Sequence, residues 1–212
     1  MSTLLQLRTR LNGEIGVATD AETAPWSVAV RNQAISDGYA ELWRVGVWKD
    51  AKQDLASVTN QWAYALTSIR RLDRLELLDS SLRLLEEPKG NVELDHAGTN
   101  TYRLRLVSPV ATGSTISVRG WTAYVSVFAS DAAVDDLPTE HVRVPLLKAK
   151  AILWRAQLAT FARWGEKQSI PPEMNLSIDQ FLAMIAAAER EFETEARSLA
   201  NLRPRTGRVR SV

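Results

Sequence analysis

The chain has 212 residues, of which 45% are hydrophobic and 24% charged, and its formal net charge is +1. This composition is typical of a globular protein with a sizeable core, and a net charge this small gives the whole chain no bulk attraction to polyanions such as nucleic acid. Because the chain contains no cysteine, disulfides, thiolate catalysis and cysteine-ligated metal sites are excluded.

The first 45 residues have helical periodicity. Ser2 or Thr3 is expected to cap a short helix with a leucine face, and the Asn12-Gly13 pair is expected to end it. A second helix is predicted over residues 25–45, where apolar side chains recur at helical spacing. The polar residues 49–60 predict irregular structure.

Short runs of alternating side chains fill the middle of the chain. The alternation is clearest in residues 102–106 and 123–128, and turns rich in glycine and asparagine separate the runs. Several short strands with frequent turns predict a small antiparallel sandwich. The predicted strands are residues 62–66, 72–78, 82–85, 102–106, 116–118 and 123–128.

An acidic connector over residues 129–142 leads to two amphipathic helices. The first is expected to have Pro145 in its first turn and to run to Trp164. It is apolar on two sides, which is typical of a helix wedged between neighbours. A capping-box pattern beginning at Ser177 predicts the start of the last helix, residues 178–199.

Together these elements predict an α+β fold, in which the N- and C-terminal helices form one helical bundle with a small antiparallel β-sandwich inserted between them. We expect the N-terminal part of the bundle in residues 1–60, the insert in 61–130 and the C-terminal part in 131–200. Residues 201–212 are expected to form an extended basic arm.

The last two helices carry opposite charge. Residues 143–167 have six basic side chains against one acid, and residues 178–199 have five acids against two arginines. Two interpretations are open: these are solvated faces of an antiparallel hairpin with weak surface pairing, or they complement each other between subunits of a ring. The candidate subunit-interface residues are Lys148, Arg155, Glu189 and Glu193.

The sequence shows no catalytic pattern. His96 and His141 lack further spaced ligands, so both are expected to be structural or exposed. Asp135 and Asp136 lie in the polar connector, where charge at a helix entry explains them better than a catalytic carboxylate pair. Phosphate-loop and nucleophile-elbow patterns are missing from the sequence. We therefore expect no enzyme, no cofactor and no metal.

The basic arm is the strongest signal outside the predicted core. Pro204 stops a helix from continuing and Gly207 adds backbone freedom. Arginines without a counter-acid attract phosphate or an acidic groove, so partner docking stands beside the alternative of an idle terminus. The candidate docking residues are Arg203, Arg205, Arg208 and Arg210.

Residues 110–156 combine a strand region that closes on Leu137-Pro138 with a long alanine-rich helix. With the N-terminal pair of helices, the second of which Trp26 opens, this pattern resembles the head-to-tail connector proteins (adaptor or head-completion proteins) of tailed bacteriophages. The similarity spans most of the chain. The smallest members of that family are nearly all helical, and this chain differs from them by its predicted β insert.

The resemblance implies a homo-oligomeric ring, commonly of twelve subunits, docked beneath the portal protein at the head–tail junction of a virion. The chain would be synthesised in the host cytoplasm. Such a ring extends the channel for genomic double-stranded DNA, which passes without sequence reading, and offers a platform to a tail or stopper protein. The four arginines of residues 201–212 would then form the portal-binding arm, and no membrane partner is expected.

Two other functions remain open. The basic helix 144–164 and the arginine tail would suit a small DNA-binding regulator, although that helix uses side chains such as Leu147 and Trp154 for packing rather than for reading bases. A small hydrolase with its site in the β insert would need a cluster of titratable side chains in a cleft.

Overall fold

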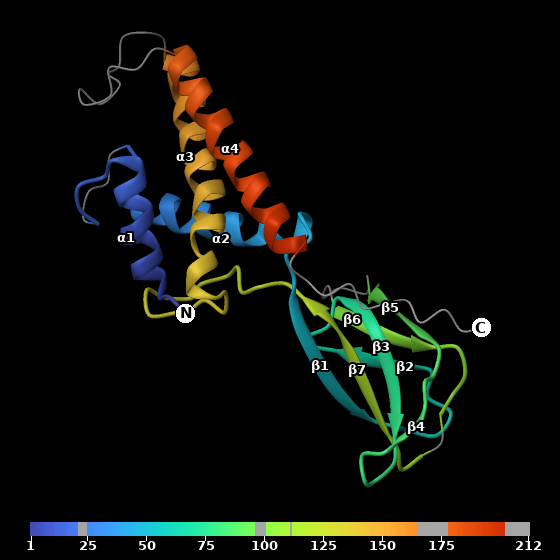
Figure 1. Cartoon of the computed structure of the whole chain (residues 1–212). Coiled ribbons are helices and arrows are strands. Elements are labelled where there is room, and N and C mark those ends of the chain that lie inside the picture. Colours follow the sequence, from blue (N-terminus) through green and yellow to red (C-terminus); the bar gives the residue numbers. More distant parts are fainter. Residues whose placement is uncertain (21–24, 96–100, 111, 165–177, 202–212) are drawn as a thin grey trace. The chain divides into compact units, whose positions relative to one another are not determined.

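The structure is a computed structural model that describes residues 1–20, 25–95, 101–110, 112–164 and 178–201 (Figure 1). Its fold is α+β, as the sequence predicts, with helices and antiparallel sheets in separate parts of the chain. The chain forms two compact units. Unit 1 combines Met1–Val47 with the chain from Tyr124 onward, and unit 2 is Trp48–Ala123, where the sequence predicted an insert over residues 61–130.

Unit 1 is helical and is built from both ends of the chain (Figure 1). Its elements are α1 (Leu4–Ile15), α2 (Val28–Arg44), the 3-10 helix η1 (Thr139–His141), α3 (Arg143–Trp164) and α4 (Ile178–Asn201).

Local sequence signals explain where the helices begin. Thr3 caps α1 through a capping box with Gln6, as expected, and Ser27 caps α2 by accepting a hydrogen bond from the Val30 amide. The prediction that Asn12-Gly13 ends the first helix was wrong, because α1 continues to Ile15 and ends at Gly16, whose φ is 75°. A glycine inside a helix costs only about 1 kcal/mol, which the burial of the following turn offsets. Ser177 lies outside the described residues.

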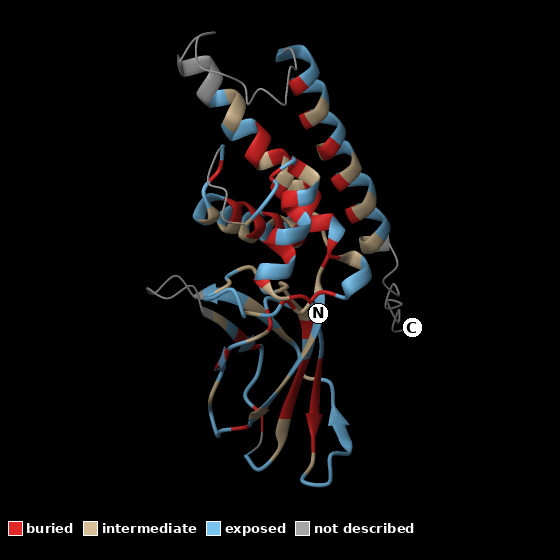
Figure 2. Ribbon diagram, turned by 90° about the vertical axis from the view of Figure 1, so that its left-hand side faces the viewer, coloured by how far each residue is buried: buried red, intermediate tan, exposed pale blue. Residues whose placement is uncertain are grey.

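All four α-helices contribute to one hydrophobic core. Leu7, Tyr39, Leu153 and Phe192, one from each helix, are all fully buried or nearly so, and Figure 2 shows the buried residues gathered on the facing sides of the helices. The predicted bundle of N- and C-terminal helices is therefore confirmed.

Helices α2 and α3 approach very closely at one point. A Cβ atom added to Gly38 would lie 2.3 Å from the carbonyl oxygen of Pro145 and 3.3 Å from the amide nitrogen of Ala149. Only a residue without a side chain fits this crossing, so Gly38 sets the distance between the two helices.

Unit 2 is a two-sheet antiparallel sandwich. The first sheet has the strand order β1-β7-β3-β4 and the second has the order β2-β6-β5. Strand β7 pairs with β1 from Lys49↔Thr122 onward, and β6 pairs with both of its neighbours. The strands are β1 (Lys49–Ala56), β2 (Ala63–Leu66), β3 (Arg71–Leu78), β4 (Leu84–Glu86), β5 (Gly90–Asp95), β6 (Thr101–Leu106) and β7 (Thr115–Thr122).

Alternation along the strands builds the core of unit 2. In β6, Leu104 and Leu106 are buried while Arg103 and Arg105 are exposed, and in β7 Ile116 is buried. The buried set forms one cluster between the two sheets. The side chains that alternate with it stay on the outer faces, where they are available for contacts.

Two sequence predictions in this region were wrong. Residues 49–60 were expected to be irregular, but most of them form β1, an edge strand that half-buries only Ala51, Gln53 and Leu55. Residues 123–128 were expected to form a strand, but they have no regular structure. Tyr124 and Phe128 instead pack against the helical core of unit 1.

Candidate interaction surfaces

Helices α3 and α4 lie side by side and antiparallel, and opposite charges meet along their seam (Figure 1). Arg143 pairs with Glu191 and, at 2.6 Å, with Glu195, near the start of α3. Glu189 lies between Lys148 at 3.7 Å and Arg155 at 2.6 Å. The hydrogen bond that Arg143 donates to Glu191 raises the pKa of Arg143 above its ordinary value.

The four predicted interface residues are thus engaged within the chain. Lys148, Arg155 and Glu189 pair across the seam, and Glu193 pairs with Arg197 at 3.3 Å on α4 itself. Partly exposed pairs of this kind contribute about 0–1 kcal/mol each. These contacts correspond to the interpretation of the opposite charges as pairing within a hairpin.

A buried arginine joins four segments of unit 1. Arg8 on α1 is 1% exposed. Its guanidinium donates to Asp20 at 2.5 and 2.6 Å, to Asp131 at 2.8 and 2.9 Å and to Asn32 of α2 at 2.9 Å. The hydrogen bonds that Arg8 donates to Asp131 and Asp20 raise the pKa of Arg8, and the same bonds lower the pKa of both carboxyl groups. This cluster fixes the connector against the N-terminal helices.

A buried carboxylate forms a second anchor. Asp135 is 1% exposed and accepts hydrogen bonds from the Ser2 amide and, at 2.6 Å, from the Tyr39 hydroxyl. Its own amide donates to the Ser2 carbonyl at 2.9 Å. Burial, followed by the hydrogen bond to Asp135, raises the pKa of Tyr39. Asp135 is therefore an internal acceptor that holds the N-terminal segment, and not a charge at a helix entry.

Of the two histidines and the four arm arginines that the sequence analysis singled out, the structure describes only His141. His141 is half-exposed at the end of η1. Among the described residues, no group of three or more histidine, aspartate or glutamate side chains is placed to hold a metal ion. None of the helices in the described ranges is long and apolar enough to span a membrane. His96 and the arm residues Arg203, Arg205, Arg208 and Arg210 lie outside the described residues.

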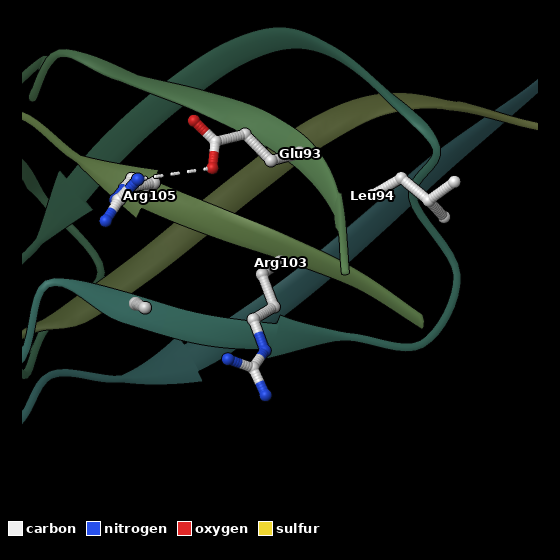
Figure 3. Close-up of a pocket in the computed structure, with 5 residues that line it drawn as sticks. Glu93, Leu94, Arg103 and Arg105 are labelled. Carbon is white, nitrogen blue, oxygen red and sulfur yellow. Dashed lines mark ion pairs between the residues drawn. The ribbon is translucent and has the colours of Figure 1, made fainter. Parts of the chain in front are cut away.

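The outer face of the β2-β6-β5 sheet carries a hollow of about 230 Å³. We call it the arginine hollow; it is lined by Ala63, Glu93, Leu94, Arg103 and Arg105. Strand pairing places Ala63 opposite Arg105 and Glu93 opposite Arg103. Figure 3 shows Glu93 reaching Arg105, at 3.5 Å, while the Arg103 guanidinium extends away from both.

The dimensions and charge of the hollow limit what it can hold. It is smaller than the roughly 300–1,000 Å³ of small-molecule pockets. Two arginines and one glutamate line the hollow, and Arg105 remains 67% exposed although it is ion-paired. The small side chain of Ala63 leaves room beside the guanidinium. The hollow therefore suits an inserted side chain with a neighbouring acid better than it suits a metabolite.

No protein-family model and no curated protein matches the chain. Among solved structures, it is similar to a chain of the "Neck of empty GTA particle computed with C6 symmetry", with 13% identity, a TM-score of 0.30, and 85% of this chain and 87% of that chain covered. It is also similar to a chain of the "Virion of native gene transfer agent (GTA) particle", with 10% identity, a TM-score of 0.32 and the same coverage. TM-scores this low fix neither the fold nor the function of this chain.

Sequence reasoning missed the two buried anchors and the hollow. Arg8 and Asp131 are 123 positions apart, and so no local pattern joins them. The hollow did leave a signal, because the alternation in residues 102–106 predicted β6 and implied that Arg103 and Arg105 share one face. The sequence did not show that β2 lies beside β6 and places the small side chain of Ala63 opposite Arg105, which leaves that face open.

Proposed function

We propose that this chain is a structural head-to-tail adaptor of a tailed phage. Identical subunits form a ring under the portal protein, extend the channel for double-stranded DNA and present a platform to a tail or stopper protein. The arm that follows α4 docks on the portal through Arg203, Arg205, Arg208 and Arg210.

The observation that carries this proposal is the closure of unit 1 from both ends of the chain. Two polar anchors, from buried Arg8 to Asp131 and from buried Tyr39 to buried Asp135, join the N-terminal helices to the connector that leads into α3. Near the end of α4, Leu199 and Ala200 pack against the unit 1 core. The C-terminal end of α4 is therefore part of a well-packed body, which supports a docking role for the arginines that follow it in the sequence.

The test is to mix the purified full-length chain with the portal protein encoded in the same genome and to image the complex by electron microscopy. We expect a ring of this chain on the portal. Replacing the four arm arginines together by alanine should abolish the complex, because their charge-assisted hydrogen bonds would be lost.

The matched control replaces four exposed arginines of unit 1, Arg10, Arg44, Arg190 and Arg197, by alanine, which removes the same charge. This control should still bind. Portal binding that survives loss of the arm arginines would reject the arm, and a wild-type chain that never binds the portal would reject the adaptor.

The alternative of a DNA-binding regulator has less support. Lys148 and Arg155 of α3 already pair with Glu189, and Leu147, Leu153 and Trp154 of the same helix are buried. Salt-dependent binding of the isolated chain to a DNA duplex would favour this alternative.

A further inference from the structure

The β3–β4 hairpin exposes three leucines within four residues, one in its turn and two at the start of β4. Leu82 is 69% exposed, Leu84 51% and Leu85 56%. We call Leu82, Leu84 and Leu85 the leucine turn. In Figure 1 this hairpin forms one end of unit 2. Single exposed apolar side chains are ordinary, whereas a contiguous group marks an interaction surface.

The backbone presents this turn at a cost. Leu82 has a φ of 60°, in the left-handed region that disfavours a leucine. Asp79 holds the conformation, since its carboxylate accepts hydrogen bonds of 2.8 Å from the amides of Ser81 and Arg83. Leu82 is thus held in a strained backbone conformation while its apolar side chain is exposed to water. Such a combination indicates a functional contact.

The surroundings of the turn indicate the charge of its partner. Glu86, the last residue of β4, is exposed and makes no ion pair with any residue in the described ranges. Its neighbour Glu87 pairs with Arg74. A partner for this surface should therefore combine an apolar recess with a basic side chain.

The arginine hollow has both properties, since Ala63 and Leu94 give it apolar walls and Arg105 gives it an exposed guanidinium. We propose that the leucine turn of one copy inserts into the arginine hollow of the next copy, with Glu86 facing Arg105. The turn belongs to the edge of one sheet and the hollow to the outer face of the other. The contact is therefore heterologous and joins copies head to tail, which closes into a ring where the rotation allows.

This contact deepens the adaptor proposal, since it rests on that proposal for ring closure, and it is tested separately. The full-length chain has no native cysteine, so introduced cysteines report only on the chosen sites. Leu84→Cys and Ala63→Cys variants are mixed and oxidised at concentrations where the wild type elutes as an oligomer. The mixture should give a covalent dimer that neither variant gives alone.

The control mixture pairs Ala63→Cys with Val127→Cys, an 82% exposed apolar position in unit 1, and should give little dimer. Equal yields in both mixtures, no cross-link in either, or a wild type that stays monomeric at every concentration would overturn the contact. A portal-bound ring without the Leu84–Ala63 cross-link would leave the adaptor standing. The cross-link without portal binding would support the contact between copies and reject the adaptor.

Two further variants separate contact from folding. Leu82→Asn places a residue that tolerates the left-handed region at the turn, so its melting temperature should not fall, while its association should weaken by about tenfold or more. Arg105→Glu should weaken association similarly, and combining it with Glu86→Arg should restore it. Unchanged association of Leu82→Asn, or no rescue by the reversed pair, would contradict the proposal.

Discussion

The Tyr39 hydroxyl donates a 2.6 Å hydrogen bond to the Asp135 carboxylate, across 96 positions of the chain. Both groups are buried, and the same carboxylate accepts a hydrogen bond from the Ser2 amide. One acid thus ties together the start of the chain, the middle of α2 and the connector before α3. This relationship makes the closure of unit 1 measurable by single substitutions.

Tyr39→Phe should destabilise the protein by about 1.5–3 kcal/mol, because a buried carboxylate loses a hydrogen-bond donor. Thermal or urea unfolding measures the change. Tyr102→Phe is the control, since Tyr102 is half-buried and its hydroxyl bonds to no residue that the structure describes. Equal effects of the two substitutions would show that the Asp135 contact contributes little.

Gly38→Ala should cost about 1–3 kcal/mol, because its methyl group overlaps the Pro145 carbonyl oxygen and forces α2 away from α3. Gly13→Ala is a matched change inside α1, where a Cβ meets nothing within 4 Å. It should stabilise by about 0.5–1 kcal/mol, through helix propensity. If the two substitutions change the unfolding free energy with opposite sign, the close crossing is confirmed. A Gly38→Ala variant as stable as the wild type would contradict it.

Asp20→Asn should reduce stability in a pH-dependent way. The hydrogen bond from Arg8 lowers the pKa of Asp20 below its ordinary value of 3.8. A carboxyl group whose folded pKa is lowered stabilises the protein above its unfolded pKa, and this contribution disappears as the pH falls through the folded pKa. The difference in unfolding free energy between wild type and variant should be largest near neutral pH and shrink below about pH 4.

Asp37→Asn provides the comparison for this measurement. Asp37 is an exposed carboxylate on α2 that accepts a hydrogen bond from Gln33 and pairs with no cation of the described chain. Its removal should change stability little at neutral pH. A difference for Asp20→Asn that grew on acidification would refute the role of the Arg8 pair.

A double-mutant cycle on Arg155 and Glu189 should give a coupling free energy of about 0.2–1 kcal/mol that weakens with added salt, because this pair is partly exposed. Arg155→Met and Glu189→Gln should leave the oligomeric mass unchanged, as measured by light scattering. A smaller mass would instead support the interpretation that these charges join subunits.

The sequence predicted the fold where hydrophobic patterning was strong. Leucines alternate with arginines in residues 102–106 and gave β6, and the stripe through Leu147 and Trp154 gave α3. It failed for β1, because this edge strand buries Ala51 and Leu55 only in part and its charged side chains obscure the alternation. It also failed for residues 123–128, because Tyr124 and Phe128 pack against the helical core of unit 1 instead of facing a sheet.

The interaction surfaces were less predictable than the fold. Arg8 looks like an ordinary surface residue of a helix until Asp131 is brought to it from 123 positions away. Leu82 looks like a strand residue, since its left-handed backbone depends on hydrogen bonds to Asp79 that propensity does not reveal. In each case tertiary packing or turn geometry determines which residue forms the hydrogen bonds, and the local sequence pattern does not predict it.

The pairing of Lys49 with Thr122 has a consequence for engineering the chain. Antiparallel partners have Cα atoms about 5 Å apart, so the polypeptide leaves the helical body and returns to it through a single rung. A short hairpin that joined Lys49 directly to Thr122 could therefore replace the whole β-sandwich without changing the ends of the chain that build the helical unit.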